Sequence, residues 1–364
     1  MRICVIADAK EVHTRNWVAD LRARGHEVRL ISFSAAGAGG GDVIRLRTAF
    51  PNSRLRYLTN LFKVRRIVAA CAPDLVLGYY VTGNGLLAAF AGRHPLVLAT
   101  SGDDVAITPW TSPIMKATIR WILSRADVVT AWGESMAEAA RGLGVPPGRV
   151  FTLARGVDLA RCEPGLRAER SDPHQIVSTR KLAPEYQLDV VIRAFAALRA
   201  LRPDARLTLV GDGTERRRLE ALAAALDVGA QVSFAGAVPH EAVFGYLHRA
   251  DVYVSASYSE GTSNSLLEAM ACGVFPVVAD IPPNREWVVH GVNGFLFPHR
   301  DPARLRECLL RALGRPQLLE EARRRNREIV RERADWQRNM AEYERLFRRL
   351  VAPRQSDELA GATT

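Results

Sequence analysis

Two glutamates, Glu260 and Glu268, stand eight residues apart in the segment SEGTSNSLLEAMACG. The small residues 261–263 between them predict a loop that leads into a helix, with Ser263 or Asn264 as a good N-cap. The free N–H groups and positive dipole end of such a helix start favour a phosphate or pyrophosphate. A carboxylate can accept two hydroxyl hydrogen bonds at once. The segment therefore suits a ligand that is both phosphorylated and rich in hydroxyl groups, and sugar nucleotides are such ligands.

The same spacing has a plainer interpretation. Two glutamates eight residues apart often occur by chance, and Glu268 could be an ordinary residue on a helix surface. The elements around the segment therefore have to support a binding site.

Short apolar runs rich in β-branched residues alternate with helical stretches, which is the pattern of a parallel sheet covered on both faces. The first series of runs lies at 2–8, 28–33, 75–80, 96–100, 128–132 and 150–154, and the second at 176–180, 207–211, 232–236, 252–257 and 275–280. The polar, proline-bearing stretch 161–174 between them has the composition of a linker. The sequence predicts an α/β fold of two doubly wound domains, with ligands at the carboxyl ends of strands and in the crevice between the domains.

The segment from Glu260 to Glu268, together with the AMACGVFPVVAD that follows it, resembles the EX7E signature of the retaining GT-B glycosyltransferases. This family is often called glycosyltransferase group 1. Other segments resemble this family in order and spacing, namely LARGVD (153–158), LTLVGDG (207–213), VSFAGAVPHEAV (232–243), LHRADVYVSAS (247–257) and REWVVHGVNGFLF (285–297). The resemblance covers nearly the whole chain and is densest from about 150 to 300.

The resemblance implies a GT-B fold, in which two Rossmann-like domains face a central cleft. Residues 1–165 would be the acceptor-binding domain and residues 166–330 the nucleotide-sugar-binding domain. A C-terminal helix at 331–350 would return to the first domain, and 351–364 would be a tail.

The resemblance also implies roles at the donor site. Glu268 would bind the ribose hydroxyls of the nucleotide, and Glu260 would lie at the donor sugar. Backbone N–H groups of the loop would contact sugar hydroxyls, and those at the helix start would hold phosphate. The donor-binding residues expected beside Glu268 are Gly261, Thr262, Ser263, Asn264, Ser265, Leu266, Tyr186 and Gly211.

The family's basic pair on the donor diphosphate is only partly present. Arg180 or Lys181 can fill the arginine position, but Tyr186-Gln187 stands where Lys-Gly is expected. Because the leaving diphosphate gains negative charge in the transition state, cations placed there are usually a large catalytic term. We therefore expect Glu260, Arg180 and Lys181 to be catalytic, with both cations serving the diphosphate or Tyr186 donating a hydrogen bond.

The N-terminal domain departs further from the family. The loop after its first strand, ADAKEVHTRNW, is not glycine-rich. It still lies at the carboxyl end of that strand, where Asp8, Lys10, His13 and Arg15 could meet an acceptor. The segment ATSGDDV (99–105) resembles an H-G-S-D-V element, with Asp104 at the aspartate and Ser101 where a histidine is common. Asp8, His13, Arg15 and Asp104 are therefore the residues expected on the acceptor side.

The resemblance implies a retaining hexosyltransferase that uses a UDP- or GDP-linked sugar and a hydroxyl of a glycan, lipid-linked or small-molecule acceptor. Retention in this family is described as front-face substitution without a protein nucleophile, and the sequence has no Gly-x-Ser-x-Gly elbow for covalent acyl transfer. No metal or cofactor is expected, since the fold type needs none and no carboxylate cluster requires one. A sugar-nucleotide epimerase or a phosphorylase of the same fold is the alternative.

The net charge of +11 suggests an anionic partner, and residues 1–165 carry +8 of it. No RRM, KH or helix-turn-helix signature supports a nucleic-acid partner, and a Rossmann dehydrogenase would need G-x-G-x-x-G after the first strand. Two basic stretches with apolar residues at helical spacing, 53–70 and 113–125, fit either an anionic lipid surface or core helices with a solvated face.

The five cysteines form no CxxC pair, and an odd number fits a reduced compartment. The first apolar run is too short for a signal peptide, and the uncharged stretch 75–92 predicts a strand, a turn and a helix rather than a membrane span. We therefore expect a cytoplasmic protein, peripheral on the inner face of the cytoplasmic membrane if the basic stretches bind lipid.

Overall fold

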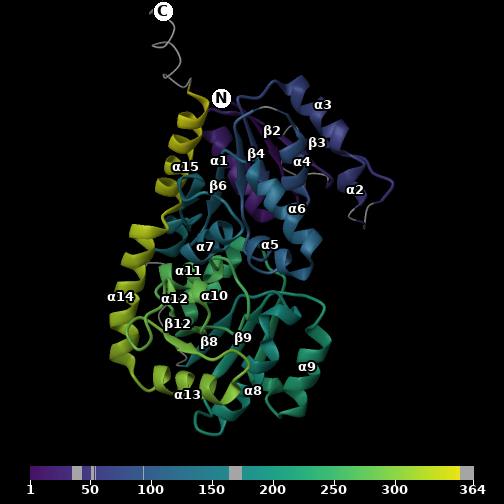
Figure 1. Cartoon of the computed structure of the whole chain (residues 1–364). Helices are drawn as coiled ribbons and strands as arrows, with labels where there is room; N and C mark the ends of the chain where they lie inside the picture. Colours follow the sequence, from purple (N-terminus) through teal and green to yellow (C-terminus); the bar gives the residue numbers. More distant parts are fainter. Residues whose placement is uncertain (35–42, 51–52, 54, 93, 164–173, 353–364) are drawn as a thin grey trace, which may run out of the picture. The chain divides into compact units, whose positions relative to one another are not determined.

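A computed structural model describes residues 1–34, 43–50, 53, 55–92, 94–163 and 174–352 (Figure 1). The chain forms two compact units: unit 1 comprises Met1–Leu153 and Met340–Thr364, and unit 2 comprises Ala154–Asn339. The domain boundary expected at 165/166 lies outside the described residues, as does the expected tail from residue 353 onward.

Unit 1 is built on a seven-stranded parallel sheet with the order β3-β2-β1-β4-β5-β6-β7. Its strands are β1 (Arg2–Ile6), β2 (Glu27–Ser32), β3 (Val43–Arg45), β4 (Leu75–Tyr79), β5 (Leu96–Ala99), β6 (Val128–Ala131) and β7 (Val150–Thr152). The helices between them are α1 (Val12–Ala23), α2 (Leu55–Leu58), α3 (Leu61–Cys71), α4 (Asn84–Phe90), α5 (Asp103–Ala106), α6 (Pro113–Ser124) and α7 (Glu134–Gly142), with a 3-10 helix, η1 (Thr108–Thr111). The strand order reverses direction between β1 and β4.

Unit 2 repeats this plan with a six-stranded parallel sheet in the order β10-β9-β8-β11-β12-β13. Its strands are β8 (Gln175–Ser178), β9 (Arg206–Val210), β10 (Val232–Gly236), β11 (Val252–Ser255), β12 (Phe275–Ala279) and β13 (Phe295–Phe297). Its helices are α8 (Leu188–Arg199), α9 (Arg216–Ala225), α10 (His240–Arg249), α11 (Asn264–Ala271), α12 (Pro282–Arg285), α13 (Pro302–Leu313) and α14 (Pro316–Arg333), with a 3-10 helix, η5 (Pro184–Tyr186). Here the order reverses between β8 and β11.

The central strands are apolar along their whole length because helices cover both faces of each sheet. All five residues of β4 and all five of β12 are buried. The prediction of two doubly wound α/β domains is therefore confirmed, and each of the eleven predicted runs forms a strand. The short edge strands β3 and β13 were not among the predicted runs.

The uncharged stretch 75–92 forms β4, a turn and α4, as its interrupted pattern predicted. Among the residues that the structure describes, no helix is both long and apolar enough to cross a membrane.

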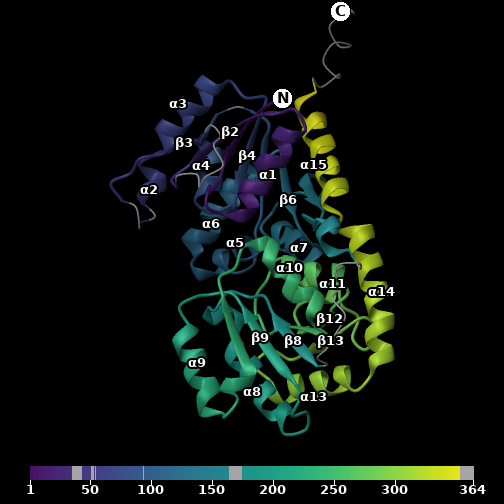
Figure 2. The ribbon, with the colours of Figure 1, turned by 180° about the vertical axis from the view of Figure 1, so that it is seen from behind.

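The last helix, α15 (Trp336–Val351), contributes its second half to the core of unit 1. The rings of Tyr343 and Phe347 lie 5.0 and 6.4 Å from the ring of Trp17 in α1. The Tyr343 hydroxyl donates to the Leu153 carbonyl oxygen. Figures 1 and 2 show α1 and α15 side by side in both views. This aromatic packing holds α15 against α1 in unit 1.

Candidate functional site

The reversal of strand order in unit 2 marks the expected ligand site, because open α/β sheets bind ligands outside the carboxyl ends of strands at such a switch point. The chain leaving β8 carries Arg180, and the chain leaving β11 carries Glu260 and the start of α11. The two segments are about 80 residues apart in sequence but adjacent in the sheet.

Arg180 is the centre of this site. Its Nη2 donates to Oε1 of Glu260, and its Nη1 donates to the Ser263 hydroxyl at 2.9 Å. The guanidinium also lies over the ring of Tyr186, 4.3 Å from its centroid. Burial by itself would lower the pKa of Arg180, but the Glu260 carboxylate beside it holds the pKa above its usual value. Only 8% of the Arg180 side chain and 11% of Glu260 are exposed, so this is a buried pair of full charges.

The start of α11 is tied to this pair. Ser263 is the N-cap residue, and its hydroxyl accepts from the Leu266 backbone N–H at 3.4 Å. The Ser265 hydroxyl donates to the Thr179 carbonyl oxygen at 3.3 Å, which links the helix to the end of β8. Since the first N–H groups of a helix have no partner within it, Asn264 and Ser265 present donors next to the Arg180 guanidinium. This arrangement of a cation and a helix start can bind a phosphate group.

Glu268 lies one turn farther along α11 and pairs with a residue that the sequence did not single out. Its Oε1 is 2.8 Å from Nε2 of His240, the first residue of α10. The hydrogen bond to Glu268 raises the pKa of His240, against the lowering effect of burial. His240 lies within the family-like segment 232–243, but no local pattern links it to a glutamate 28 residues later.

Gly211, at the end of β9, acts through its lack of a side chain. Its φ is +150°, and a Cβ there would lie 2.4 Å from the Arg180 carbonyl oxygen. Its N–H donates to the Gly236 carbonyl oxygen at 2.9 Å. The structure therefore gives Gly211 a backbone role: its lack of a side chain lets the end of β9 approach the Arg180 backbone.

Tyr186-Gln187 departs from the Lys-Gly of the family pattern in residue type, but the backbone at Gln187 has a conformation typical of glycine. Gln187 has φ +46° and ψ +45°, the left-handed conformation that favours glycine. Tyr186, in η5, packs on Arg180 rather than supplying a second cation. Lys181 is exposed, in contrast to its buried neighbour Arg180.

The residues expected on the acceptor side all lie in unit 1. Asp8 accepts from the Lys10 N–H at 2.9 Å, Arg15 donates to the Lys10 carbonyl oxygen, and the His13 ring packs edge-on against Trp132. Asp104 is buried, and its carboxylate accepts from the N–H groups of Val81 at 2.8 Å and Ser101 at 2.9 Å. Burial raises the pKa of Asp104 to about 6, against these hydrogen bonds. Asp104 thus joins the loop after β4 to the loop after β5.

No group of three or more His, Cys, Asp or Glu side chains within the described ranges is arranged to hold a metal ion. The expectation that no metal is needed stays a prediction.

Two family models match the chain. Residues 166–331 match the model described as Glycosyl transferases group 1, and residues 2–132 match the model described as Glycosyl transferase 4-like. Unit 2, which holds the Arg180–Glu260 pair, thus corresponds to the first family and most of unit 1 to the second.

Curated relatives agree with these matches. A glycogen synthase of Mycobacterium tuberculosis is 29% identical over 218 residues, covering 60% of this chain and 53% of the relative. A GDP-mannose-dependent alpha-(1-6)-phosphatidylinositol monomannoside mannosyltransferase of Mycolicibacterium smegmatis is 32% identical over 243 residues, covering 62% of this chain and 61% of the relative. The chain thus spans between about half and three fifths of the length of these relatives.

The solved structures show the fold. Anabaena Alr3699/HepE in complex with UDP-glucose superposes with a TM-score of 0.79 at 18% identity, covering 96% of this chain and 100% of the other. The whole chain therefore shares the two-domain α/β fold of this structure, and the GT-B fold that the sequence resemblance implied is confirmed.

The His240–Glu268 pair gives a pH-dependent prediction. A histidine whose pKa is raised in the folded protein stabilises it fully below the unfolded pKa, about 6.5, and the effect is lost as pH rises through the raised value. We expect the melting-temperature difference between wild type and Glu268→Gln to shrink as the pH rises above about 6.5. NMR titration of His240 should show a lower pKa in Glu268→Gln. An unchanged pKa, or an equal effect from Glu328→Gln on the exposed side of α14, would contradict the assignment.

Proposed function

The chain belongs to the glycosyltransferase group 1 family, and on that premise we propose that it is a hexosyltransferase with a UDP- or GDP-linked sugar as donor. The observation that carries the proposal is the convergence of Arg180, Glu260 and the start of α11 at the switch point of unit 2. A cation and helix N–H groups suit a diphosphate, and the neighbouring carboxylates suit the hydroxyl groups on either side of it.

In this proposal each glutamate binds a different part of the donor. Glu268 accepts from the ribose hydroxyls; a carboxylate has about four acceptor positions, of which His240 takes one. Glu260 lies at the hexose, on the other side of the α11 start, with the loop 261–263. The Anabaena HepE structure is a complex with UDP-glucose, which supports a nucleotide sugar as donor here.

Arg180 has the central part in the chemistry that we propose. As the bond from the sugar to the diphosphate breaks, negative charge grows on the leaving phosphate, and a preorganised cation stabilises that charge. The Glu260, Ser263 and Tyr186 contacts hold the guanidinium in place before any donor binds. We take Lys181, the sequence neighbour of Arg180, as the candidate for a second cation, and its side chain is exposed.

Front-face substitution fits this set of residues. The incoming hydroxyl attacks the sugar on the face that the diphosphate leaves, a phosphate oxygen accepts the hydroxyl proton, and the configuration is retained. No protein nucleophile or metal takes part in this scheme. The same fold also serves epimerases and phosphorylases, from which a transferase differs by releasing nucleoside diphosphate and forming a new glycoside.

We also propose a cytoplasmic enzyme that binds the membrane surface through 53–70 and 113–125. Phe62 in α3 is 79% exposed and Ile114 in α6 is 80% exposed, the largest exposed fractions among the large apolar side chains that the structure describes. Lys116 lies over the ring of Trp110, with 3.8 Å from its Nζ to the ring centroid. Exposed apolar and aromatic side chains among cations are suited to an anionic lipid surface.

The donor site predicts which variant loses nucleotide binding. UDP, GDP, UDP-glucose and GDP-mannose would be tested by thermal shift, where a donor at 100 times its Kd adds about 2.7 kcal/mol of stability. At least one should stabilise the wild type, with the shift largely lost in Glu268→Ala. Two control variants accompany it. His240→Ala removes the partner of Glu268 but keeps the carboxylate, and Glu328→Ala removes an exposed glutamate elsewhere in unit 2. Equal shifts in the wild type and Glu268→Ala would sink the donor site.

Glu260 should affect turnover more than nucleotide binding. We expect Glu260→Gln to lower kcat by about 10²- to 10³-fold, the range seen when a group that stabilises a transition state is removed. Affinity for the free nucleoside diphosphate should change little, and EDTA should leave the wild-type rate unchanged. A parallel loss of turnover and nucleotide affinity would place Glu260 at the nucleotide instead of the sugar.

The membrane surface can be tested by sedimentation with phosphatidylglycerol liposomes at low and moderate salt. The wild type should sediment at low salt, less at moderate salt, and the double variant Phe62→Ser, Ile114→Ser should stay in solution. Leu201→Ser is a matched control, because Leu201 is a 55% exposed apolar residue in unit 2. Absence of wild-type binding at low salt would rule the surface out.

A further inference from the structure

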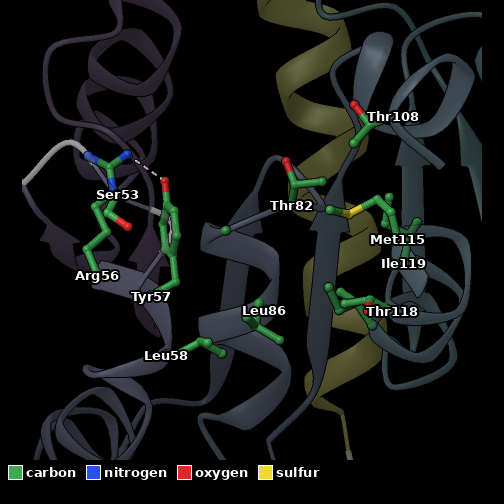
Figure 3. Close-up of a pocket in the computed structure, with 12 residues that line it drawn as sticks. Ser53, Arg56, Tyr57, Leu58, Thr82, Leu86, Thr108, Met115, Thr118 and Ile119 are labelled. Atoms are coloured by element: carbon green, nitrogen blue, oxygen red, sulfur yellow. Dashed lines mark hydrogen bonds between the residues drawn. The ribbon is translucent and has the colours of Figure 1, made fainter. Parts of the chain in front are cut away.

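Unit 1 contains an apolar pocket that the proposed donor site does not use (Figure 3). Its volume is about 590 Å³, within the usual range for small-molecule sites. Tyr57 and Leu58 of α2 and Leu86 of α4 form part of its wall, together with Met115 and Ile119 of α6. Figure 3 shows Tyr57 on one side and Met115 and Thr118 across from it. The pocket offers mainly apolar surface, with threonine hydroxyls between.

A second cavity next to it has the opposite character. Its volume is about 760 Å³, and four cations line it: Lys10, Arg45, Arg47 and Arg56. None of the described residues that line it is acidic. It lies at the carboxyl ends of three neighbouring strands, since Lys10 follows β1, Phe33 and Ser34 follow β2, and Arg45 ends β3.

Arg56 belongs to both cavities and forms the wall between them. Its Nη2 donates to the Tyr57 hydroxyl at 2.7 Å. Its guanidinium carbon lies 5.1 Å from the ring centroid of Phe33, which lines the basic cavity, and 4.8 Å from that of Tyr57, which lines the apolar pocket. The cationic and the apolar space therefore meet at one side chain.

The side chains between the two cavities lie at the switch point of unit 1, where the strand order reverses between β1 and β4. Gly83, in the loop after β4, has φ +67°, and a Cβ there would lie 2.5 Å from the Tyr57 ring. The same loop is held by Asp104 through the Val81 N–H. The Tyr57 ring thus packs directly on the backbone at the place where an open α/β sheet binds its ligand.

Two physical requirements define what could fill both spaces. Four cations around one volume repel each other, and a bound anion reduces this repulsion. A phosphate suits the cavity best, because an arginine can bind two of its oxygens at once. Filling the apolar pocket is favourable only for an apolar group, because the favourable free energy comes from removing apolar surface from water. Leu58 at the pocket wall is 55% exposed, so such a group would bury part of its side chain.

We propose that unit 1 binds a phosphorylated amphiphile, with its phosphate or diphosphate in the basic cavity and its hydrocarbon chain in the pocket of Figure 3. This rests on the proposed function and names the class of its acceptor, a lipid phosphate that carries the receiving hydroxyl.

Water-soluble alkyl phosphates, kept below the concentration at which they form micelles, test the proposal without a membrane. Hexyl, octyl and decyl phosphate would be titrated into the full chain by calorimetry, with decanol, inorganic phosphate and glucose 1-phosphate as comparisons. Affinity should rise about threefold to fourfold per added CH₂ until the pocket is full. Decanol and both free phosphates should bind at least tenfold more weakly than decyl phosphate.

Matched variants locate each half of the ligand. Met115→Trp, which fills the apolar pocket, should weaken decyl phosphate at least tenfold, whereas Leu201→Trp should not, because Leu201 is an exposed apolar residue of unit 2 that lines neither cavity. Arg45→Gln should weaken it about tenfold, the usual effect of one charge-assisted hydrogen bond. Arg149→Gln makes the same charge change at an exposed residue that lines neither cavity and should bind as the wild type does.

Three results would overturn the proposal. Equal binding of glucose 1-phosphate and decyl phosphate would indicate a free phosphorylated ligand, and equal binding of decanol would indicate an apolar ligand without a phosphate. Full affinity in both Met115→Trp and Arg45→Gln would place the ligand elsewhere. Because these titrations contain no donor, they stand apart from the Glu268→Ala experiment, so failure of the acceptor class and failure of the donor site are separate results.

Discussion

The buried pair of Arg180 and Glu260 is the interaction on which the candidate site depends. Two charges removed from water cost several kcal/mol each in desolvation, and only close mutual contact with further hydrogen bonds offsets this. The partners meet because β8 and β11, distant in sequence, are neighbours at the reversal of strand order. A buried cation without a carboxylate beside it would be unstable, so Glu260 keeps Arg180 in position.

The surrounding backbone is built to support that pair. Gly211 lets the end of β9 approach the Arg180 carbonyl, and Ser265 ties α11 to Thr179 at the end of β8. The left-handed Gln187 directs the chain so that Tyr186 packs on the guanidinium. At position 186, where the family resemblance implied a lysine, the tyrosine stacks on the guanidinium and adds no charge.

The two units share a topology but differ in how their charges are balanced. In unit 2, Arg180 at the switch point faces a carboxylate, whereas in unit 1 four cations line a cavity with no acidic residue among its described lining. This difference accounts in part for the uneven charge of the chain, in which residues 1–165 carry +8 of the total +11. The anionic ligand that we propose for unit 1 would complete the balance.

The sequence by itself determined the elements and their class. Apolar runs predicted the strands of two doubly wound sheets, and the polar loop before α11 predicted its N-cap, because burial and capping depend on neighbouring residues. Only the tertiary structure decided which distant side chains meet. His240 joins Glu268 across 28 residues, and Arg56 joins two cavities between Phe33 and Tyr57. Such pairs follow from strand order and helix placement, which no local pattern encodes.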